Sequence, residues 1–92
     1  MPLETDRPYN LKRPSERVAY LEAALEKNDP AIFVEAIGDI AMAMSVNGFA
    51  ELAGMNRHVV YKAFVKGGNP SVQTLFKALH AAGVRMTVRP SS

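Results

Sequence analysis

The side chains best suited to recognition chemistry gather in a short cationic stretch just past the middle of the chain. This stretch holds Arg57, His58, Lys62 and Lys66 and has no acidic residue. An arginine can bridge O6 and N7 of guanine with two hydrogen bonds, and a valine such as Val59 can contact the methyl group of thymine. Lysine and tyrosine side chains can bind phosphate oxygens. The pattern therefore favours binding to duplex DNA.

Two short helices joined by a tight turn are expected to position this stretch. Ala50 is small enough for the helices to approach closely, and Gly54 can adopt the positive φ that ends the first helix. Five apolar residues in register with them would form one shared inner face: Phe49, Ala53, Met55, Val60 and Ala63. The spacing predicts a helix-turn-helix over roughly residues 46–65, whose second helix would enter the DNA major groove.

The residues that face away from this inner face are the candidate DNA contacts. They are Asn47, Asn56, Arg57, His58, Val59, Tyr61, Lys62 and Lys66. Asn56 would cap the second helix. Tyr61 and Lys66 are placed for phosphates, and the first helix would offer backbone N–H groups to a phosphate near Asn47. For any single one of these residues, a solvated helix face is the alternative interpretation.

The charges divide sharply along the chain. Residues 1–51 hold all nine acidic residues and five basic ones, a net charge of −4. Residues 52–92 hold six basic residues and no acidic one, a net charge of +6. The sign changes at the predicted turn, and such an asymmetry suggests that the second half faces a polyanion.

Composition narrows the class of protein further. The chain has 92 residues, enough for one domain, and its 48% apolar and 22% charged residues are typical of soluble globular proteins. It has no cysteine, which excludes disulfides and thiolate metal sites and suits the cytoplasmic location that we expect. No apolar run approaches the roughly 20 residues of a membrane span, and the first residues lack the layout of a secretion signal.

Catalysis is not expected. His58 and His80 lie on different predicted helices, and no His-x-x-x-His pair supports a metal site. Glu35 and Asp39 share a helix face, but a pair of solvated carboxylates is the usual meaning of that spacing. We therefore expect no enzymatic activity, no metal and no cofactor.

The remaining elements read mostly as helices. Residues 1–14 contain three prolines and predict an extended arm, which Tyr9 and Leu11 could attach to the body. Apolar periodicity, caps and breakers predict helices over about 15–27, 30–44, 47–53, 57–66 and 71–82. Gly38 should weaken the second of these slightly. The predicted fold is all-α, with five helices in a domain over residues 15–83.

Residues 84–90 break the helical pattern. Val84, Met86 and Val88 alternate with polar residues, which predicts a β-strand. One strand is not stable alone, and the same strand of a second copy is the simplest partner. The sequence therefore predicts a homodimer joined through these three residues.

Several segments also carry a family resemblance. The most specific are Tyr61-Lys62-Ala63-Phe64, Gly68-Asn69-Pro70 and Thr74-Leu75-Phe76-Lys77. With residues 20–26 and 38–41, they resemble the addiction-module antidote family, small antitoxins with a lambda-repressor-like (Xre-type) helix-turn-helix. The resemblance implies an antitoxin that neutralises a RelE/ParE-like toxin by direct binding. It also implies a dimer that represses its own operon by binding the promoter.

Three positions depart from the family's usual pattern. Gly48 stands where such repressors usually carry a Gln that clamps a phosphate, so that contact is lost. Asn47 replaces the usual Ser cap and is chemically equivalent. His58 stands where the family commonly has Glu, which adds to the basic character of the second helix.

The acidic half is the candidate surface for the toxin, because RelE/ParE-like toxins tend to be basic. Glu16, Glu22 and Glu26 on the first predicted helix are the candidate toxin contacts, and the arm over residues 1–14 could become ordered on binding. The alternative function is a helical protein-interaction module, an antitoxin or adaptor that has lost DNA binding.

Overall fold

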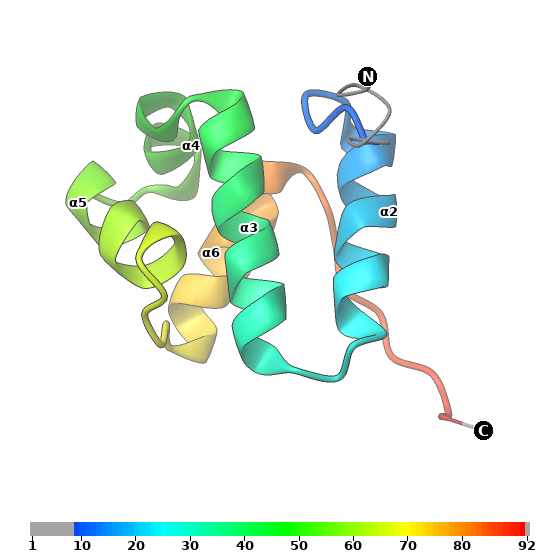
Figure 1. Ribbon diagram of the computed structural model, residues 1–92. Coiled ribbons are helices and arrows are strands. Elements are labelled where there is room, and N and C mark those ends of the chain that lie inside the picture. Colours follow the sequence, from blue (N-terminus) through cyan, green and yellow to red (C-terminus); the bar gives the residue numbers. More distant parts are fainter. Residues whose placement is uncertain (1–8, 92) are drawn as a thin grey trace, which may run out of the picture.

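The chain folds into helices joined by short turns (Figure 1). The computed structural model describes residues 9–91 and contains no β-strand in that range. The elements are α2 (Pro14–Leu25), α3 (Pro30–Met44), α4 (Val46–Ala53), α5 (Arg57–Val60), η1 (Tyr61–Val65) and α6 (Val72–Ala82). α5 runs directly into the wide π-type helix η1, so the two act as one rod. With α5 and η1 counted as one, residues 9–91 form five helices and no strand, which confirms the predicted all-α fold for this range.

Local capping chemistry explains where most helices begin and end. The Asp29 carboxylate accepts a hydrogen bond from the Ala31 N–H at 2.9 Å, and Pro30 occupies the first turn of α3, where its missing N–H costs nothing. The Ser71 hydroxyl accepts from the Thr74 N–H at 3.1 Å and opens α6. Gly83 ends α6 with a φ of 75°. These three terminal signals were all readable in the sequence.

The corner between α3 and α4 differs from the prediction. The residue that caps α4 is Ser45, whose hydroxyl accepts from the Gly48 N–H at 3.1 Å, so Asn47 is not the cap. Ser45 turns the chain within one residue, with a φ of 85°, and the two helices meet at a bend of 111°. Within the described part of the chain, no single helix is long and apolar enough to cross a membrane; only α3 and α4 taken together, across this bend, reach that length and composition.

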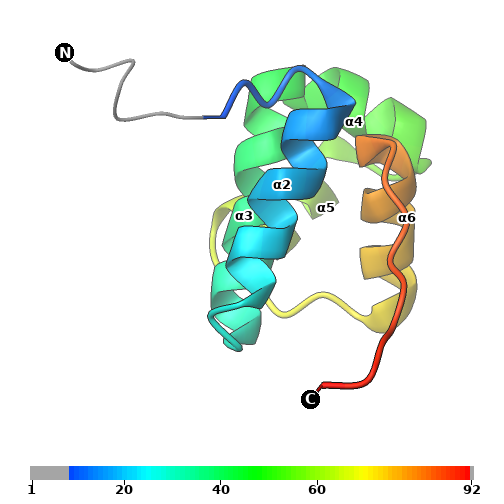
Figure 2. The same ribbon diagram turned by 90° about the vertical axis from the view of Figure 1, so that its right-hand side faces the viewer.

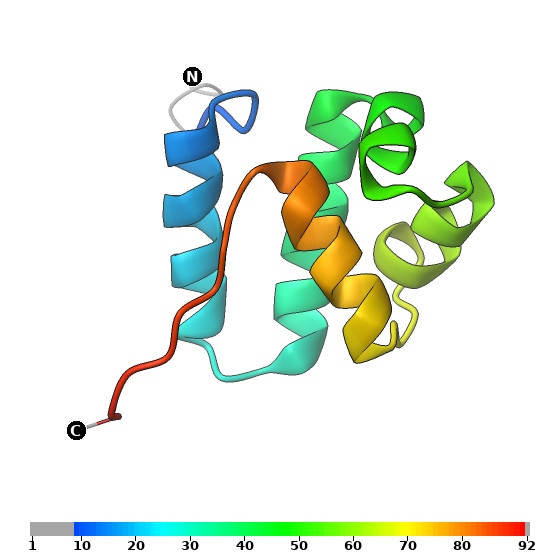
Figure 3. The ribbon, with the colours of Figure 1, turned by 180° about the vertical axis from the view of Figure 1, so that it is seen from behind.

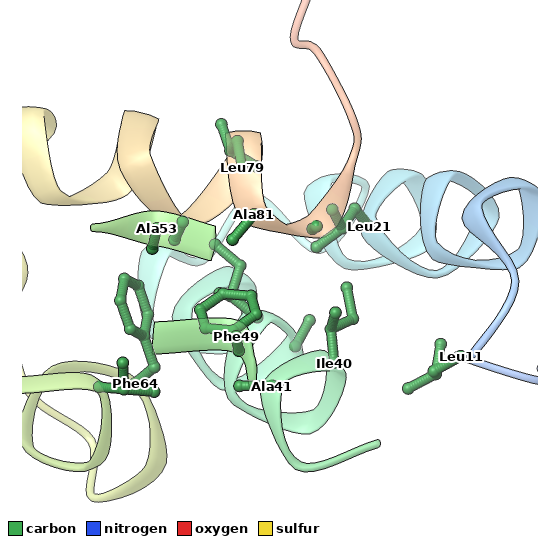
Figure 4. Packing of buried hydrophobic residues seen from close by; sticks show 14 of the residues in the cluster. Leu11, Leu21, Ile40, Ala41, Phe49, Ala53, Phe64, Leu79 and Ala81 are labelled. Atoms are coloured by element: carbon green, nitrogen blue, oxygen red, sulfur yellow. The ribbon is translucent and has the colours of Figure 1, made fainter. Parts of the chain in front are cut away.

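The core forms around α3, which lies between α2 on one side and α4, η1 and α6 on the other (Figures 1 and 4). Ile37 and Ile40 of α3 have no exposed surface, and neither has Phe49 of α4. The buried apolar side chains form a single cluster: Leu11, Leu21, Ala24, Phe33, Ala36, Ile37, Ile40, Ala41, Phe49, Ala50, Ala53, Val60, Phe64, Ala78, Leu79, Ala81 and Ala82. This shared core holds the predicted turn unit rigidly against the rest of the domain.

A glycine in the middle of α3 allows η1 to cross it closely. A Cβ atom at Gly38 would overlap the backbone carbonyl oxygen of Phe64 and lie 3.0 Å from its carbonyl carbon. No other residue type fits there without moving one helix away from the other. The glycine that looks like a weakness in the helical pattern is therefore a packing requirement.

A buried arginine ties the two ends of the helical domain together. Arg17 of α2 is 8% exposed. Its guanidinium donates from Nε to the Leu11 carbonyl at 2.7 Å and from Nη2 to the Lys12 carbonyl at 3.0 Å. It also donates from Nη1 to the carbonyl of Ala82, the last residue of α6, at 2.9 Å. One side chain thus satisfies three carbonyls from segments far apart in the sequence.

The predicted attachment of the N-terminal arm is confirmed for its described part. Leu11 is buried in the core, and the Tyr9 ring meets the Tyr20 ring edge-on with centroids 5.3 Å apart. Such an aromatic contact adds about 1 kcal/mol to simple burial. The rest of the predicted arm, residues 1–8, lies outside the described residues.

The predicted strand over residues 84–90 is wrong for the single chain. This C-terminal segment (residues 84–91) leaves the end of α6 and runs back toward the opposite end of the domain (Figure 2). Among the described residues, its backbone makes one hydrogen bond, from the Val84 N–H to the Leu79 carbonyl at 3.1 Å, as part of the helix cap. A strand needs a neighbouring backbone with free N–H and C=O groups, and the helices beside this segment have none to offer.

Candidate nucleic-acid interface

The turn between α4 and α5 has the predicted geometry. Gly54 adopts the left-handed conformation, with φ 68° and ψ 36°, and ends α4. The Gly54 N–H donates to the Glu51 carbonyl at 3.2 Å, and the Met55 N–H donates to the Ala50 carbonyl at 3.0 Å. Because a Cβ atom is disfavoured at this φ, glycine is the residue that this turn requires.

The inner face of the unit is also largely as predicted. Phe49 and Val60 are fully buried and Ala53 is buried, whereas Met55 and Ala63 are half-buried at the margin. Phe64, which reaches the core from η1, is buried as well (Figure 4). The second helix of the unit is therefore anchored along its length by large side chains in the core.

Asn56 caps this second helix. Its Oδ1 atom accepts a hydrogen bond from the His58 N–H at 2.7 Å, so the helix starts at Arg57. The cap was predicted, and it places Arg57 and His58 in the first turn. In a helix that enters the major groove, the N-terminal residues contact base edges.

The outer face of this helix is open. Arg57, His58, Val59, Lys62 and Lys66 are all exposed. Within the described residues, no hydrogen bond or ion pair engages the side chains of the two lysines.

Among the remaining candidates, Asn47 is exposed in the first turn of α4, and Tyr61 is half-buried. The Arg57 guanidinium lies 5.8 Å from the centre of the Tyr61 ring, within the range of a cation–π contact. This contact orients Arg57 without using its hydrogen-bond donors.

The π-type geometry of η1 was not predicted. The Lys66 N–H donates to the Tyr61 carbonyl, five residues earlier, at 2.8 Å. Two glycines let this wide turn pack: Gly38 beneath Phe64, and Gly68, whose Cβ would overlap the Lys62 carbonyl oxygen and lie 2.9 Å from the Ala63 Cα. The signal in the sequence was a glycine inside a strong helical pattern, which often marks a close approach of two backbones.

The division of charge along the sequence becomes a division in space for α5 and η1, although Arg85 and Arg89 lie beside α2. The acid-free half supplies α5 and η1, which lie on the opposite side of the domain from α2 (Figure 1). Glu22 of α2 and Glu26, the residue that follows its last turn, are exposed, and Glu16 is half-buried. A polyanion that approaches α5 and η1 would therefore not meet the acidic surface of α2.

The structure brings together two predicted sites that the sequence treated as separate. Glu22 and Glu26, candidate toxin contacts, line the same groove as Val84 and Met86, candidate dimer contacts. Val84 is half-buried, whereas Met86 and Val88 are exposed.

The histidines and carboxylates of the described region do not form a metal site. Between residues 9 and 91, no group of three or more His, Cys, Asp or Glu side chains could hold a metal ion. The Glu35 and Asp39 pair is exposed, and Asp39 accepts a hydrogen bond from the Tyr20 hydroxyl at 2.5 Å. That contact fastens α2 to α3.

Comparison with known proteins now identifies the family. A family model described as a probable addiction module antidote protein matches residues 5–90. The chain belongs to this antidote family. The antidote is also 33% identical over 72 residues to an uncharacterized protein of Haemophilus influenzae (strain ATCC 51907 / DSM 11121 / KW20 / Rd), an alignment that covers 78% of the antidote and 74% of that relative. No solved structure matches the antidote.

Membership confirms the antidote family that the sequence motifs indicated. An antidote of an addiction module implies, in general, a toxin as its partner. The lambda-repressor-like type of its turn unit stays a prediction.

Proposed function

We propose that this antidote neutralises a RelE/ParE-like toxin by direct binding and represses its own operon by binding promoter DNA as a homodimer. The turn unit then acts as a lambda-repressor-like helix-turn-helix, and the protein works in the cytoplasm without catalytic activity or a cofactor. The family match supports the antitoxin role. DNA binding is supported by the site itself.

One observation carries the DNA-binding proposal. Arg57 and Lys62 are exposed on a helix whose other side is anchored in the core by Val60 and Phe64. A rigid helix with an open cationic face is what insertion into a major groove requires. If the rest of the protomer covered these two side chains, the helix would have no cationic face for DNA to contact.

Each exposed residue then takes a role suited to its chemistry. Arg57 contacts guanine, Val59 contacts a thymine methyl group, and Lys62 reaches the groove edge. Phosphates are bound by Tyr61 and Lys66 and by the backbone N–H groups at the start of α4, near Asn47.

Removing the Arg57 side chain should reduce both affinity and base preference. We expect Arg57→Ala to weaken binding to the DNA upstream of the gene by about 1–3 kcal/mol, roughly 5- to 150-fold, and to relax specificity at one base pair. Fluorescence anisotropy with the upstream DNA and with single-base variants of it measures both effects. Unchanged affinity for the upstream DNA would remove Arg57 from the interface.

Lys66→Ala is the matched control for this experiment. A phosphate contact carries no sequence information, so its loss should weaken all duplexes alike and lower the salt slope by about 1. Tyr61→Phe provides a second control, because it keeps the ring beneath Arg57 and removes only the hydroxyl.

A second function is favoured by one residue. Gly48 stands where the resembling repressors carry a phosphate-clamping Gln, so this antidote could be an interaction module without DNA binding. Salt dependence separates the two functions, since a DNA binder loses affinity steeply as salt rises. An antidote that binds no upstream DNA even at low salt, yet still neutralises its toxin, would support the interaction module.

The toxin is proposed to bind the acidic face of α2. We expect the double variant Glu22→Lys/Glu26→Lys to protect cells much less than the wild type does when it is co-expressed with the toxin encoded beside its gene. A basic toxin would be repelled by the two lysines instead of attracted by the two carboxylates. Growth rescue and co-purification measure the loss. Glu35→Lys on α3 is the control, since Glu35 is an exposed carboxylate outside this face. Full protection by the α2 variant would exclude this face.

A further inference from the structure

The C-terminal segment has an unused backbone edge. Within the described chain, no backbone hydrogen bond joins residues 85–91 to any other residue. Its apolar side chains are also uncovered, with Met86 43% and Val88 92% exposed. Free N–H and C=O groups beside exposed apolar side chains are the features on which another strand pairs.

A groove runs between this segment and α2. It has a volume of about 340 Å³ and is lined by Val18, Leu21 and Leu25 of α2 and by Val84 and Met86 of the segment. We call it the α2 groove. The segment leaves α6 and passes toward α2, as seen from behind the molecule (Figure 3). Two of the α2 side chains, Val18 and Leu25, are exposed apolar residues that lack cover.

The two walls of the α2 groove carry opposite charges. Glu22 of α2 and Glu26 at its C-terminal end line one wall, and Arg85 and Arg89 line the other from the segment. Within the described residues, no ion pair joins these carboxylates to these arginines. All four charges are therefore available to an occupant that carries both apolar and basic groups.

The groove on the other side of the segment lacks this complementarity. It has a volume of about 480 Å³, lies against α6, and is lined by Phe76 and His80 together with Arg85. Among the residues that the structure describes, no acidic side chain lines it. A basic strand is thus favoured in the α2 groove and not in the α6 groove.

We propose that the occupant of the α2 groove is the C-terminal segment of a second copy, paired antiparallel to the first about a two-fold axis at Met86. The order apolar, polar, apolar, polar, apolar over residues 84–88 reads the same in both directions. Such a palindromic pattern matches itself across a two-fold axis. Each copy places its own segment in the α2 groove of the other.

The axis at Met86 follows from the side chains that would face each other. Residues directly opposite in an antiparallel pair lie on the same face of the ladder. With the axis at Met86, Val84 faces the partner's Val88 and Arg85 faces the partner's Thr87. An axis at Thr87 would instead set Arg85 against the partner's Arg89, and like charges directly opposite are destabilising.

This inference rests on the homodimer of the proposed function but not on DNA binding. It also links dimerisation to the toxin, because Glu22 and Glu26 belong to both proposed interfaces. A toxin bound to α2 and a second copy in the α2 groove then exclude each other.

Cysteine cross-linking tests the register without interference, because the natural chain has no cysteine. Two Met86→Cys chains would face each other at about 4.5–5.5 Å between Cα atoms, within disulfide reach. We expect the full-length variant to become a covalent dimer under mild oxidation. Val88→Cys is the matched control, since two copies of residue 88 would lie about 13 Å apart along the ladder.

If solvent exposure alone governed cross-linking, Val88→Cys would react faster than Met86→Cys, since Val88 is far more exposed than Met86. Faster cross-linking at residue 88 than at residue 86 would therefore overturn the proposed register. Cross-linking of Phe76→Cys, with none at residue 86, would place the contact on α6 and overturn the α2 groove while leaving a homodimer in place. A wild-type monomer at micromolar concentration would overturn both this inference and the homodimer.

Charge exchange tests the groove itself. Arg85→Glu/Arg89→Glu and Glu22→Lys/Glu26→Lys should each be monomeric by sedimentation, because like charges then meet across the interface. Mixed in equal amounts, the two variants should form a heterodimer, since each segment meets a groove of opposite charge in the other chain. Dimers of either variant alone, or no association in the mixture, would exclude the α2 groove.

Discussion

Arg17→Met should lower the free energy of unfolding by about 3–4 kcal/mol, the largest effect that we expect from a single substitution in this protein. Hydrogen bonds from a charged group contribute about 1.5–3 kcal/mol each, and three of them are lost together. Their contributions are not additive, because methionine keeps most of the buried stem and the exposed edge of the site can admit water. Urea titration followed by circular dichroism measures the change.

Two variants separate the hydrogen bonds from the charge. Arg13→Met removes an exposed arginine just before α2 and should change stability by less than about 0.5 kcal/mol. Arg17→Lys keeps the charge, but an ammonium group cannot reproduce the planar fork that reaches three carbonyls, so most of the loss should remain. A loss below about 1 kcal/mol in Arg17→Met would mean that water replaces the guanidinium.

Gly38→Ala should destabilise the fold, although the sequence alone indicates the reverse. Alanine is the better helix former by about 1 kcal/mol. Against this, a Cβ at residue 38 meets the Phe64 backbone, and overpacking costs about 1–3 kcal/mol or more where neither backbone can move. We place the clash near the upper end, about 3 kcal/mol, so the net loss should be about 2 kcal/mol, measured by the same titration.

Gly48→Ala is the matched control, a second helical glycine with room beside it. Apart from the backbone of its own helix, the only atom of residues 9–91 within 4 Å of a Cβ there is the Ser45 hydroxyl oxygen at 3.4 Å. This variant should gain about 0.5–1 kcal/mol from helix propensity. If Gly38→Ala were stabilised as much as Gly48→Ala, α3 and η1 would not be in the contact described here.

Prediction from the sequence succeeded where the cause is local. Gly54, Asn56 and Ser71 act on backbone groups within a few residues, so their roles as turn or cap could be read directly. The exposed face of α5 followed from the same logic. Once Val60 is turned inward, the helical period places Arg57 and Lys62 outward.

Prediction failed where the cause lies in another segment. The carbonyls bound by Arg17 come from residues 6 positions earlier and 65 positions later, and no periodicity links them. The wide turn of η1 depends on Gly38, in a different helix. The strand expected over residues 84–90 needs a backbone partner that a single chain does not supply.

The unpaired C-terminal segment has a consequence for assembly beyond two molecules. A strand has two edges, and a contact about a two-fold axis uses one of them, so the other stays open to polymerisation. Pro90 cannot donate a backbone hydrogen bond. Arg85 and Arg89 repel the same basic segment of a third copy, because no acidic side chain of the described residues offsets their charge at the outer edge. These three residues would act as gatekeepers against fibre growth.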